Sequence, residues 1–245
     1  MSKIRLFIDH PLAAGQPVPL EPAQAHYLSG VMRLRAGDTL AVFNGRDGEW
    51  SARITEAGKR GGTLQTLEQT APQRDPPDLW LLFAPIKKAR TDFIVEKAAE
   101  LGASRILPVQ TDFTNSERIR QDRLQAHAIE AAEQCGGTHV PGVGELQPLS
   151  RLLEGWDPAR RLLWADEALA GPARTLGGLS AGAWAILIGP EGGFSDPERR
   201  RLTALDFVTP ISLGPRILRA DTAAVAALAL WQAALGDWQD PAGSG

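Results

Sequence analysis

The stretch AILIGPEGGFSDPE (185–198) joins an apolar run to three glycines and the start of a helix. Ser195 and Glu198 have the Ser-x-x-Glu spacing of a capping box, and Pro197 suits the first helical turn. A strand, a glycine turn and a helix N-terminus form the layout of a phosphate-binding loop. Here the turn carries Glu191 and no lysine. We therefore expect a ligand that is neutral or cationic rather than a phosphate.

A second apolar run ends in a similar turn, Leu213-Gly214-Pro215-Arg216. Ligands of open parallel sheets bind beyond the carboxyl ends of the strands, so two such turns predict one pocket with two backbone walls. S-adenosylmethionine fits this chemistry, because it carries a sulfonium and an ammonium group. Its adenine can be held by main-chain groups that only glycine allows to approach closely. The same glycines would also serve ordinary tight turns, and their spacing alone leaves this alternative open.

The elements that must position these turns divide the chain into two parts. Residues 1–70 are rich in short strands and predict a small, mainly β, barrel-like domain. Residues 71–78 contain three prolines and are predicted to be a linker. Residues 79–245 alternate strands with helices, which indicates an α/β domain with a parallel sheet covered on both faces. The strands are expected at 79–86, 105–110, 161–166, 183–190 and 207–214, and the helices at 91–102, 117–137, 196–205 and 220–238.

Composition excludes several classes of protein. The chain has 43% hydrophobic and 22% charged residues, as a soluble globular protein does. Its longest apolar run, Ala223–Trp231, is shorter than the ~20 residues that cross a bilayer, and no signal pattern opens the sequence. The single cysteine, Cys135, fits a reducing compartment and is expected to be a small buried side chain. With four scattered histidines it shows no metal-ligand spacing. We expect a cytoplasmic protein without membrane or metal.

Several motifs in combination resemble one known family. They are LIGPEGGFSDPE (187–198), LGPRILRADTAAVAAL (213–228), DFIVEKAAELGASRILPV (92–109), AAEQCGGTHVP (131–141) and HYLSGVMRLRAGD (26–38). Together they resemble the bacterial uracil-N3 methyltransferases of small-subunit (16S) ribosomal RNA, which belong to the SPOUT, or α/β-knot, class. The resemblance extends over nearly the whole chain.

This resemblance implies properties that the residues alone do not. The C-terminal domain would contain a deep trefoil knot formed by about 183–225, and the N-terminal domain would be a PUA-like RNA-binding barrel. The protein would be a homodimer that uses S-adenosylmethionine. Since the net charge is −3, we expect the assembled 30S particle rather than naked RNA to be its substrate. The implied cofactor residues are Ile188, Gly189, Gly193, Leu213, Gly214, Ile217 and Leu218, and the implied RNA-binding residues are Arg33, Arg35, Lys97 and Glu100.

Methylation of uracil at N3 makes a specific chemical demand. The N3 proton must leave, and the negative charge that develops on O2 and O4 must be stabilised. A guanidinium offers a planar fork of donors for such oxygens, so Arg219 and Arg216 are the candidate catalytic residues. Both could instead be plain surface or helix-end arginines. Lys97 and Glu100, three residues apart, could likewise form a simple surface pair.

Two positions depart from the family pattern. Gly137 stands where the family usually has an arginine, so a contact from that position to RNA phosphate is in doubt. Asp221 stands where the family often has a glutamate, which keeps the charge but shortens its reach. Two other functions remain as alternatives: a non-catalytic RNA-binding ribosome-assembly factor that uses the α/β domain for dimerisation, and a phosphoryl or nucleotidyl enzyme. The absence of a lysine in the glycine turn argues against the latter.

Overall fold

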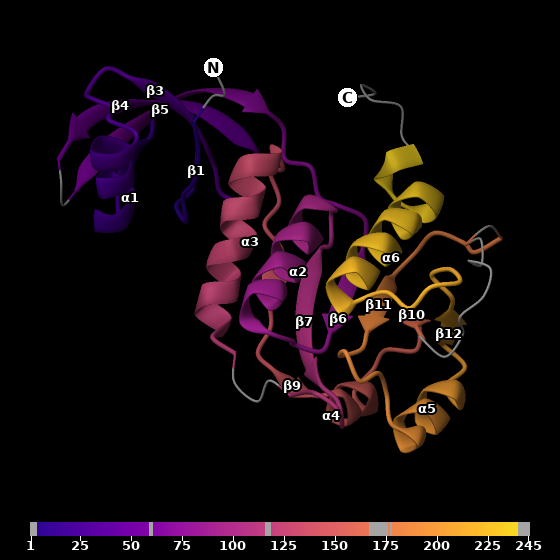
Figure 1. Cartoon of the computed structure of the whole chain (residues 1–245). Helices are drawn as coiled ribbons and strands as arrows, with labels where there is room; N and C mark the ends of the chain where they lie inside the picture. Colours follow the sequence, from indigo (N-terminus) through magenta and orange to yellow (C-terminus); the bar gives the residue numbers. More distant parts are fainter. Residues whose placement is uncertain (1–3, 59–60, 116–118, 167–175, 177, 240–245) are drawn as a thin grey trace. The chain divides into compact units, whose positions relative to one another are not determined.

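The structure is a computed structural model that describes residues 4–58, 61–115, 119–166, 176 and 178–239 (Figure 1). The chain forms two compact units. The first contains residues 1–75 and 132–140, and the second contains 76–131 and 141–245. The first unit is thus discontinuous in sequence, which nothing in the composition of 132–140 indicates. Each unit is described below by itself.

The first unit is built on a five-stranded sheet with the order β1-β3-β4-β5-β2. Strand β1 pairs parallel to β3, and the other neighbours are antiparallel. The strands are β1 (Arg5–Phe7), β2 (Pro17–Leu20), β3 (Thr39–Phe43), β4 (Glu49–Ala57) and β5 (Gly62–Ala71). Helix α1 (Pro22–His26) continues into a π-helical turn, Tyr27–Val31, and its Leu28 packs into the core of the unit.

The turn between β3 and β4 is held by a hydrogen-bonded carboxylate. The N–H of Leu12 donates to Asp47 Oδ2 at 2.9 Å, and Asn44 Nδ2 donates to the same oxygen at 2.6 Å. These two bonds, together with the nearby charge of Arg46, hold the pKa of Asp47 below its usual value. The ionised carboxylate therefore stabilises the folded turn.

We expect Asp47→Asn to lower the melting temperature at pH 7 by about 2–4 °C, because an amide cannot replace a doubly hydrogen-bonded charge. The folded pKa is depressed, so the contribution of Asp47 is complete above its unfolded pKa and disappears as the pH falls through the folded value. The melting temperatures of both proteins should therefore converge as the pH falls below the usual pKa of an aspartate side chain. The control is Asp9→Asn, which removes a carboxylate with an 80% exposed side chain. A constant difference between wild type and Asp47→Asn at all pH values would contradict this account.

Arg5 joins the two sequence segments of the first unit. Its Nε donates to Glu49 Oε2 at 2.7 Å, and its Nη1 donates to the carbonyl oxygens of Ala132 and Glu133 at 2.6 and 2.9 Å. Its Nη2 donates to the carbonyl of Gly137 at 2.8 Å. The guanidinium thus satisfies carbonyl groups at the end of helix α3 (Gln121–Cys135), which have no partner within the helix. Its side chain is only 11% exposed.

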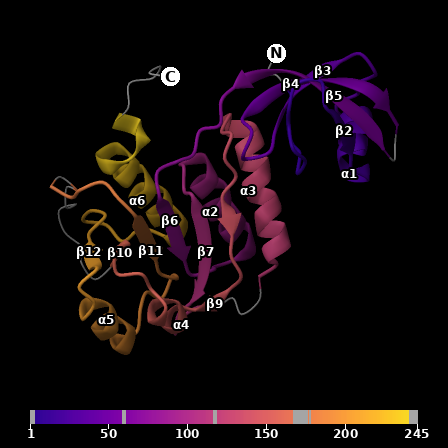
Figure 2. The same cartoon turned by 180° about the vertical axis from the view of Figure 1, so that it is seen from behind.

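The second unit has a parallel sheet with the order β12-β10-β11-β6-β7-β8, and β9 pairs with β7 outside this path (Figures 1 and 2). The pairings between these strands are all parallel, as the alternation of strands and helices predicted. The strands are β6 (Leu79–Phe83), β7 (Arg105–Gln110), β8 (Gly142–Val143), β9 (Gln147–Pro148), β10 (Arg161–Ala165), β11 (Trp184–Ile188) and β12 (Val208–Ile211).

Helices cover both faces of this sheet. Successive residues of a strand face opposite sides of the sheet, and consecutive apolar residues therefore need a cover on each side. Leu81 and Ile186 pack in one core with α2 (Lys88–Glu100), α3 and α6 (Ala220–Leu235). Leu82 and Leu187 pack in the other core with α4 (Leu149–Glu154) and α5 (Asp196–Thr203). Figure 1 shows α2 and α6 in front of the strands, and α4 and α5 below the strands in the same view. The buried parallel sheet predicted from the sequence is confirmed.

Smaller features differ from the predictions. Helix α2 begins at Lys88 and α3 begins at Gln121, and the short elements β8, β9 and α4 were not predicted. Their apolar residues are too few for a periodicity to show. Cys135, expected to be buried, is exposed because α3 ends at this residue. Among the helices that the structure describes, none is long and apolar enough to cross a membrane.

Candidate functional site

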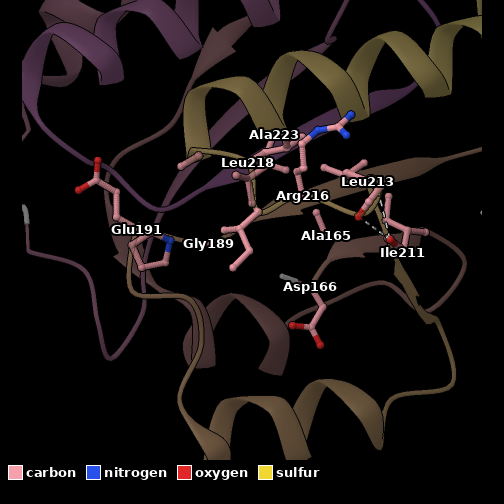
Figure 3. A pocket seen from close by; sticks show the side chains of 15 residues that line it. Ala165, Asp166, Gly189, Glu191, Ile211, Leu213, Arg216, Leu218 and Ala223 are labelled. Carbon is pink, nitrogen blue, oxygen red and sulfur yellow. Dashed lines mark hydrogen bonds between the residues drawn. The ribbon is translucent and has the colours of Figure 1, made fainter. Parts of the chain in front are cut away.

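One pocket lies at the carboxyl ends of three neighbouring parallel strands, β10, β11 and β12 (Figure 3). This is the position at which the sequence placed a site, although only two of the three strand ends were predicted to contribute. The helix that follows β12, α6, closes one side. The lining residues are Ala165, Asp166, Ile188, Gly189, Pro190, Glu191, Ile211, Ser212, Leu213, Gly214, Arg216, Ile217, Leu218, Ala220 and Ala223.

The predicted cofactor residues are largely brought together here. Ile188, Gly189, Leu213, Gly214, Ile217 and Leu218 all line the pocket. Gly193 is not among the lining residues. It has a φ of 70°, and its N–H donates to the carbonyl of Pro190 at 2.9 Å, so it closes the turn after β11. Gly193 therefore fixes the turn that carries the lining residues Pro190 and Glu191.

Two of the lining glycines are needed where they stand. A Cβ on Gly189 would lie 2.6 Å from Cε2 of Phe194, whose ring packs edge-on against Trp164 with centroids 5.6 Å apart. Gly214 has a φ of +117°, which L side chains rarely adopt, and its N–H donates to Ser212 Oγ at 3.2 Å. The wall at Gly189 and Gly214 is therefore bare backbone, as the sequence predicted for a ligand held by main-chain groups.

The capping box predicted for the helix after this turn is confirmed. Ser195 Oγ accepts from the N–H of Glu198, and a carboxylate oxygen of Glu198 accepts from the N–H of Ser195 at 2.9 Å. Ser195 Oγ also donates to Asp112 Oδ2 at 2.5 Å. The N-terminal N–H groups of α5 are thus partly satisfied within the protein. The cap fixes α5 directly after the glycine turn.

The two candidate catalytic arginines occupy different positions. Arg216 lines the pocket, and Figure 3 shows its side chain extending beside α6. Arg219 is the N-cap residue of α6, directly after the pocket residue Leu218, and its side chain is exposed. Its carbonyl accepts from the N–H of Ala223 at 2.8 Å. Across the described parts of the chain, neither guanidinium has a hydrogen-bond or ion-pair partner, so both are available to a ligand.

Arg90 on α2 connects the first glycine turn to the start of α6 and was not found by sequence reasoning. Its Nη1 lies 3.4 Å from Glu191 Oε1, and its Nε lies 3.8 Å from Asp221 Oδ2. It thereby holds the carboxylate after β11 and the carboxylate in the first turn of α6 at the pocket rim. Figure 3 shows the Glu191 carboxylate pointing away from the apolar lining. The departure at Asp221 is thus accommodated by a pairing partner within the chain.

Asp166, at the end of β10, lines the pocket and was also not selected by sequence reasoning. It is buried and forms an ion pair with Arg199 on α5. Arg199 also donates through Nε to the carbonyl of Phe194 at 3.1 Å. This pair ties the end of β10 to the segment that follows the glycine turn. A third strand end with an acidic residue, in Trp164-Ala165-Asp166, was the available signal.

The four predicted RNA-binding residues fall into two sets. Arg33 and Arg35, in the first unit, are both exposed. Lys97 and Glu100, on α2 of the second unit, form an ion pair of 2.6 Å, and neither lines the pocket. The surface-pair alternative therefore describes how Lys97 and Glu100 lie. In the part of the chain that the structure describes, no group of three or more His, Cys, Asp or Glu residues could hold a metal ion.

Comparisons with known proteins agree with this geometry. A family described as an RNA methyltransferase domain matches residues 73–232, and a family described as an RNA methyltransferase PUA domain matches 20–67. A ribosomal RNA small subunit methyltransferase E from Rickettsia conorii is 31% identical over 92% of this chain and 93% of its own length. One from Synechocystis is 34% identical over 86% of this chain and 71% of its own length.

Solved structures show the same fold. A ribosomal RNA small subunit methyltransferase E from Neisseria gonorrhoeae, bound to S-adenosylmethionine, superposes with a TM-score of 0.87. It is 28% identical, and the match covers 97% of this chain and 100% of that one. The fold and the two family matches define an RNA methyltransferase with a PUA domain. More narrowly, the chain belongs to the ribosomal RNA small subunit methyltransferase E family, as the resemblance of its motifs predicted.

Proposed function

We propose that the protein transfers a methyl group from S-adenosylmethionine to N3 of a uridine in 16S ribosomal RNA, on the assembled 30S particle. The observation that carries this proposal is the bare-backbone pocket at the ends of β10, β11 and β12. The methyltransferase family to which the chain belongs supports it, as does the relative bound to S-adenosylmethionine. Gly189 and Gly214 would present main-chain groups to adenine, and Leu213 and Leu218 would contact its apolar surface.

The residues beside the pocket suit the proposed transfer. Bound S-adenosylmethionine supplies a methyl group on a sulfonium, which is electrophilic without a metal. The guanidinium of Arg219 would orient the uracil and stabilise the charge that develops on O2 and O4 as N3 loses its proton. Arg216, in the pocket wall, would help to stabilise the same negative charge on O2 and O4. The new N3–CH₃ bond would form as the bond between the methyl carbon and sulfur breaks, and the N3 proton would pass to solvent.

The first unit is proposed to bind RNA. Arg33 and Arg35 are exposed and lie close in sequence to Tyr27, Val31 and Met32, which are 36%, 60% and 37% exposed. Cationic side chains beside an exposed aromatic ring suit a nucleic acid, because the cations contact phosphate and the ring stacks on a base. We propose that residues 1–70, which make up most of this unit, form a PUA-like barrel. Residues 71–78 would be the linker that follows the barrel.

The finer architecture remains part of the proposal. The segment 183–225 would form a deep trefoil knot of the SPOUT class in a domain of residues 79–245. The protein would act in the cytoplasm as a homodimer. Lys97 and Glu100 are retained as candidate RNA contacts, in which case their ion pair would open on binding.

A titration and a transfer assay test the proposed function. Calorimetry with S-adenosylmethionine should give one site per chain. Purified 30S particles that lack the modification should gain one N3-methyluridine, detected by nucleoside mass spectrometry, also with EDTA in excess. Reversible loss of transfer with EDTA would overturn the metal-free mechanism. RNA binding without any cofactor binding would favour the non-catalytic assembly factor.

Arg90→Met is expected to weaken S-adenosylmethionine binding about two- to fivefold, because two partly exposed ion pairs at the pocket rim are lost. The methionine keeps the aliphatic packing of the side chain. Calorimetric titration at low and high salt measures the effect, which should shrink as salt rises. The control is Arg120→Met, which removes an exposed ion pair with Asp122 away from the pocket. If both variants bind S-adenosylmethionine as tightly as wild type does, Arg90 does not contribute to cofactor binding.

A further inference from the structure

A second cavity adjoins the cofactor pocket and has no role in the function proposed so far. Its lining includes Lys87, Lys88 and Asn115, together with Pro190 and Glu191, which also line the first pocket. We propose that this cavity receives the phosphate of the substrate nucleotide, with Lys87 and Lys88 as its cationic contacts. The inference rests on the proposed function, since it places the RNA beside the cofactor.

The reaction geometry requires such a neighbouring site. A uracil that accepts a methyl group must lie against the cofactor, and the ribose and phosphate attached to that uracil must then lie on a surface next to the cofactor pocket. Pro190 and Glu191 form a shared wall, so an occupant of the second cavity contacts the same turn as the cofactor. Glu191 is engaged by Arg90, which reduces its repulsion of a phosphate.

The lysines stand on a firmly held turn. Thr91 is buried, and its hydroxyl both donates to the carbonyl of Ile86 and accepts from the N–H of Ile86, each at 3.0 Å. The N–H groups of Arg90 and Thr91 donate to the carbonyl of Lys87. Lys87 and Lys88 are exposed, and no described residue forms an ion pair with either. Two unpaired ammonium groups on a fixed turn attract an anion, not a cationic or apolar partner.

A neighbouring aromatic ring favours a nucleotide over a free anion. Phe113 packs against Gly192, where a Cβ would lie 3.3 Å from that of Phe113, and 46% of Phe113 is exposed. It lies two residues before Asn115 and packs against the glycine that follows Glu191, and both Asn115 and Glu191 line the cavity. An exposed ring on this loop can stack on a base. Cation and ring together fit a single-stranded RNA nucleotide.

The test compares variants of the full-length protein on 30S particles. We expect Lys87→Ala/Lys88→Ala to lower kcat/KM for the particle at least tenfold, while S-adenosylmethionine affinity stays within twofold of wild type. The salt dependence of RNA binding should fall by about one to two units of slope, since each lost phosphate contact removes about one unit. Phe113→Ala should lower kcat/KM about tenfold, and Phe113→Tyr should restore most of it. The control is Arg151→Ala/Arg200→Ala, which removes two exposed cations outside both cavities.

The outcomes separate the two proposals. A wild-type protein that transfers no methyl group to ribosomal RNA overturns the proposed function. An active wild type together with a fully active Lys87→Ala/Lys88→Ala variant overturns the cavity assignment alone. A loss of activity without a change in salt slope overturns the phosphate contact. Inhibition by inorganic phosphate that the double variant lacks would support the contact.

Discussion

Arg219→Ala should lower the turnover number about 10²–10³-fold, the usual cost of removing one preorganised donor to developing charge. Its guanidinium is expected to act mainly in the transition state, so turnover falls more than substrate affinity does. The structure makes this a clean substitution. Arg219 caps α6 through its backbone, which alanine keeps, and among the described residues its side chain has no partner to lose. Single-turnover transfer and calorimetry with S-adenosylmethionine measure the two effects separately.

Three further variants distinguish the role of Arg219 from the roles of other arginines. Arg219→Lys should recover little activity, because a point charge cannot replace a planar fork. Arg216→Ala should weaken cofactor binding as well as transfer, since Arg216 lines the pocket and Arg219 does not. Arg200→Ala, an exposed arginine on α5, should be fully active. Normal turnover in Arg219→Ala would move the assignment to Arg216, whereas lost cofactor affinity would make Arg219 a structural residue.

Gly189→Val should weaken S-adenosylmethionine binding about a hundredfold or more. The first added carbon would lie 2.6 Å from the Phe194 ring, which is buried and packed against Trp164, so the ring cannot easily move away. The wall must shift into the space that adenine would occupy. Gly155→Val is the matched control, because its added carbon meets open space at an ordinary φ of −100°.

A compensating change tests the cause of this loss. Phe194→Leu removes the ring atoms that the new carbon meets, so Gly189→Ala/Phe194→Leu should bind the cofactor better than Gly189→Ala does. Thermal unfolding of each variant separates a local effect from lost folding. Unchanged affinity in Gly189→Val would show that Gly189 is only a turn glycine. Equal affinities of the single and double variants would exclude the Phe194 ring as the cause.

The features that the sequence predicted depend on residues close together in the chain. The features that it missed depend on contacts between residues far apart in the chain. The glycine turns, the capping box of Ser195 and the buried parallel strands depend on neighbours within a few residues, and their patterns are visible directly. Arg90 lies 101 residues before Glu191, so its place at the pocket rim depends on the packing of α2 beside α6. No local pattern distinguishes it from other arginines of a helix.

The residues beside the site were missed for related reasons. Asp166 ends a strand without a glycine, so it lacked the signal that marked the other two strand ends. Phe113 and Lys87 stand in short connections whose composition is ordinary. Their shared surroundings arise only where the ends of β6, β7 and β11 meet at one edge of the sheet. The roles of Arg33 and Arg35 stay predictions, because exposure alone does not distinguish an RNA contact.

The contacts of Arg5 affect the order in which the protein can fold during its synthesis. Arg5 is made at the start of the chain, yet three of its acceptors belong to Ala132, Glu133 and Gly137. At a synthesis rate of about 5–20 residues per second, the ribosome needs roughly 3–13 s to proceed from residue 75 to residue 140. During this interval the strands of the first unit exist without their last partners. The N-terminal unit of the nascent chain therefore completes its folding only after the first segment of the second unit, residues 76–131, has been made.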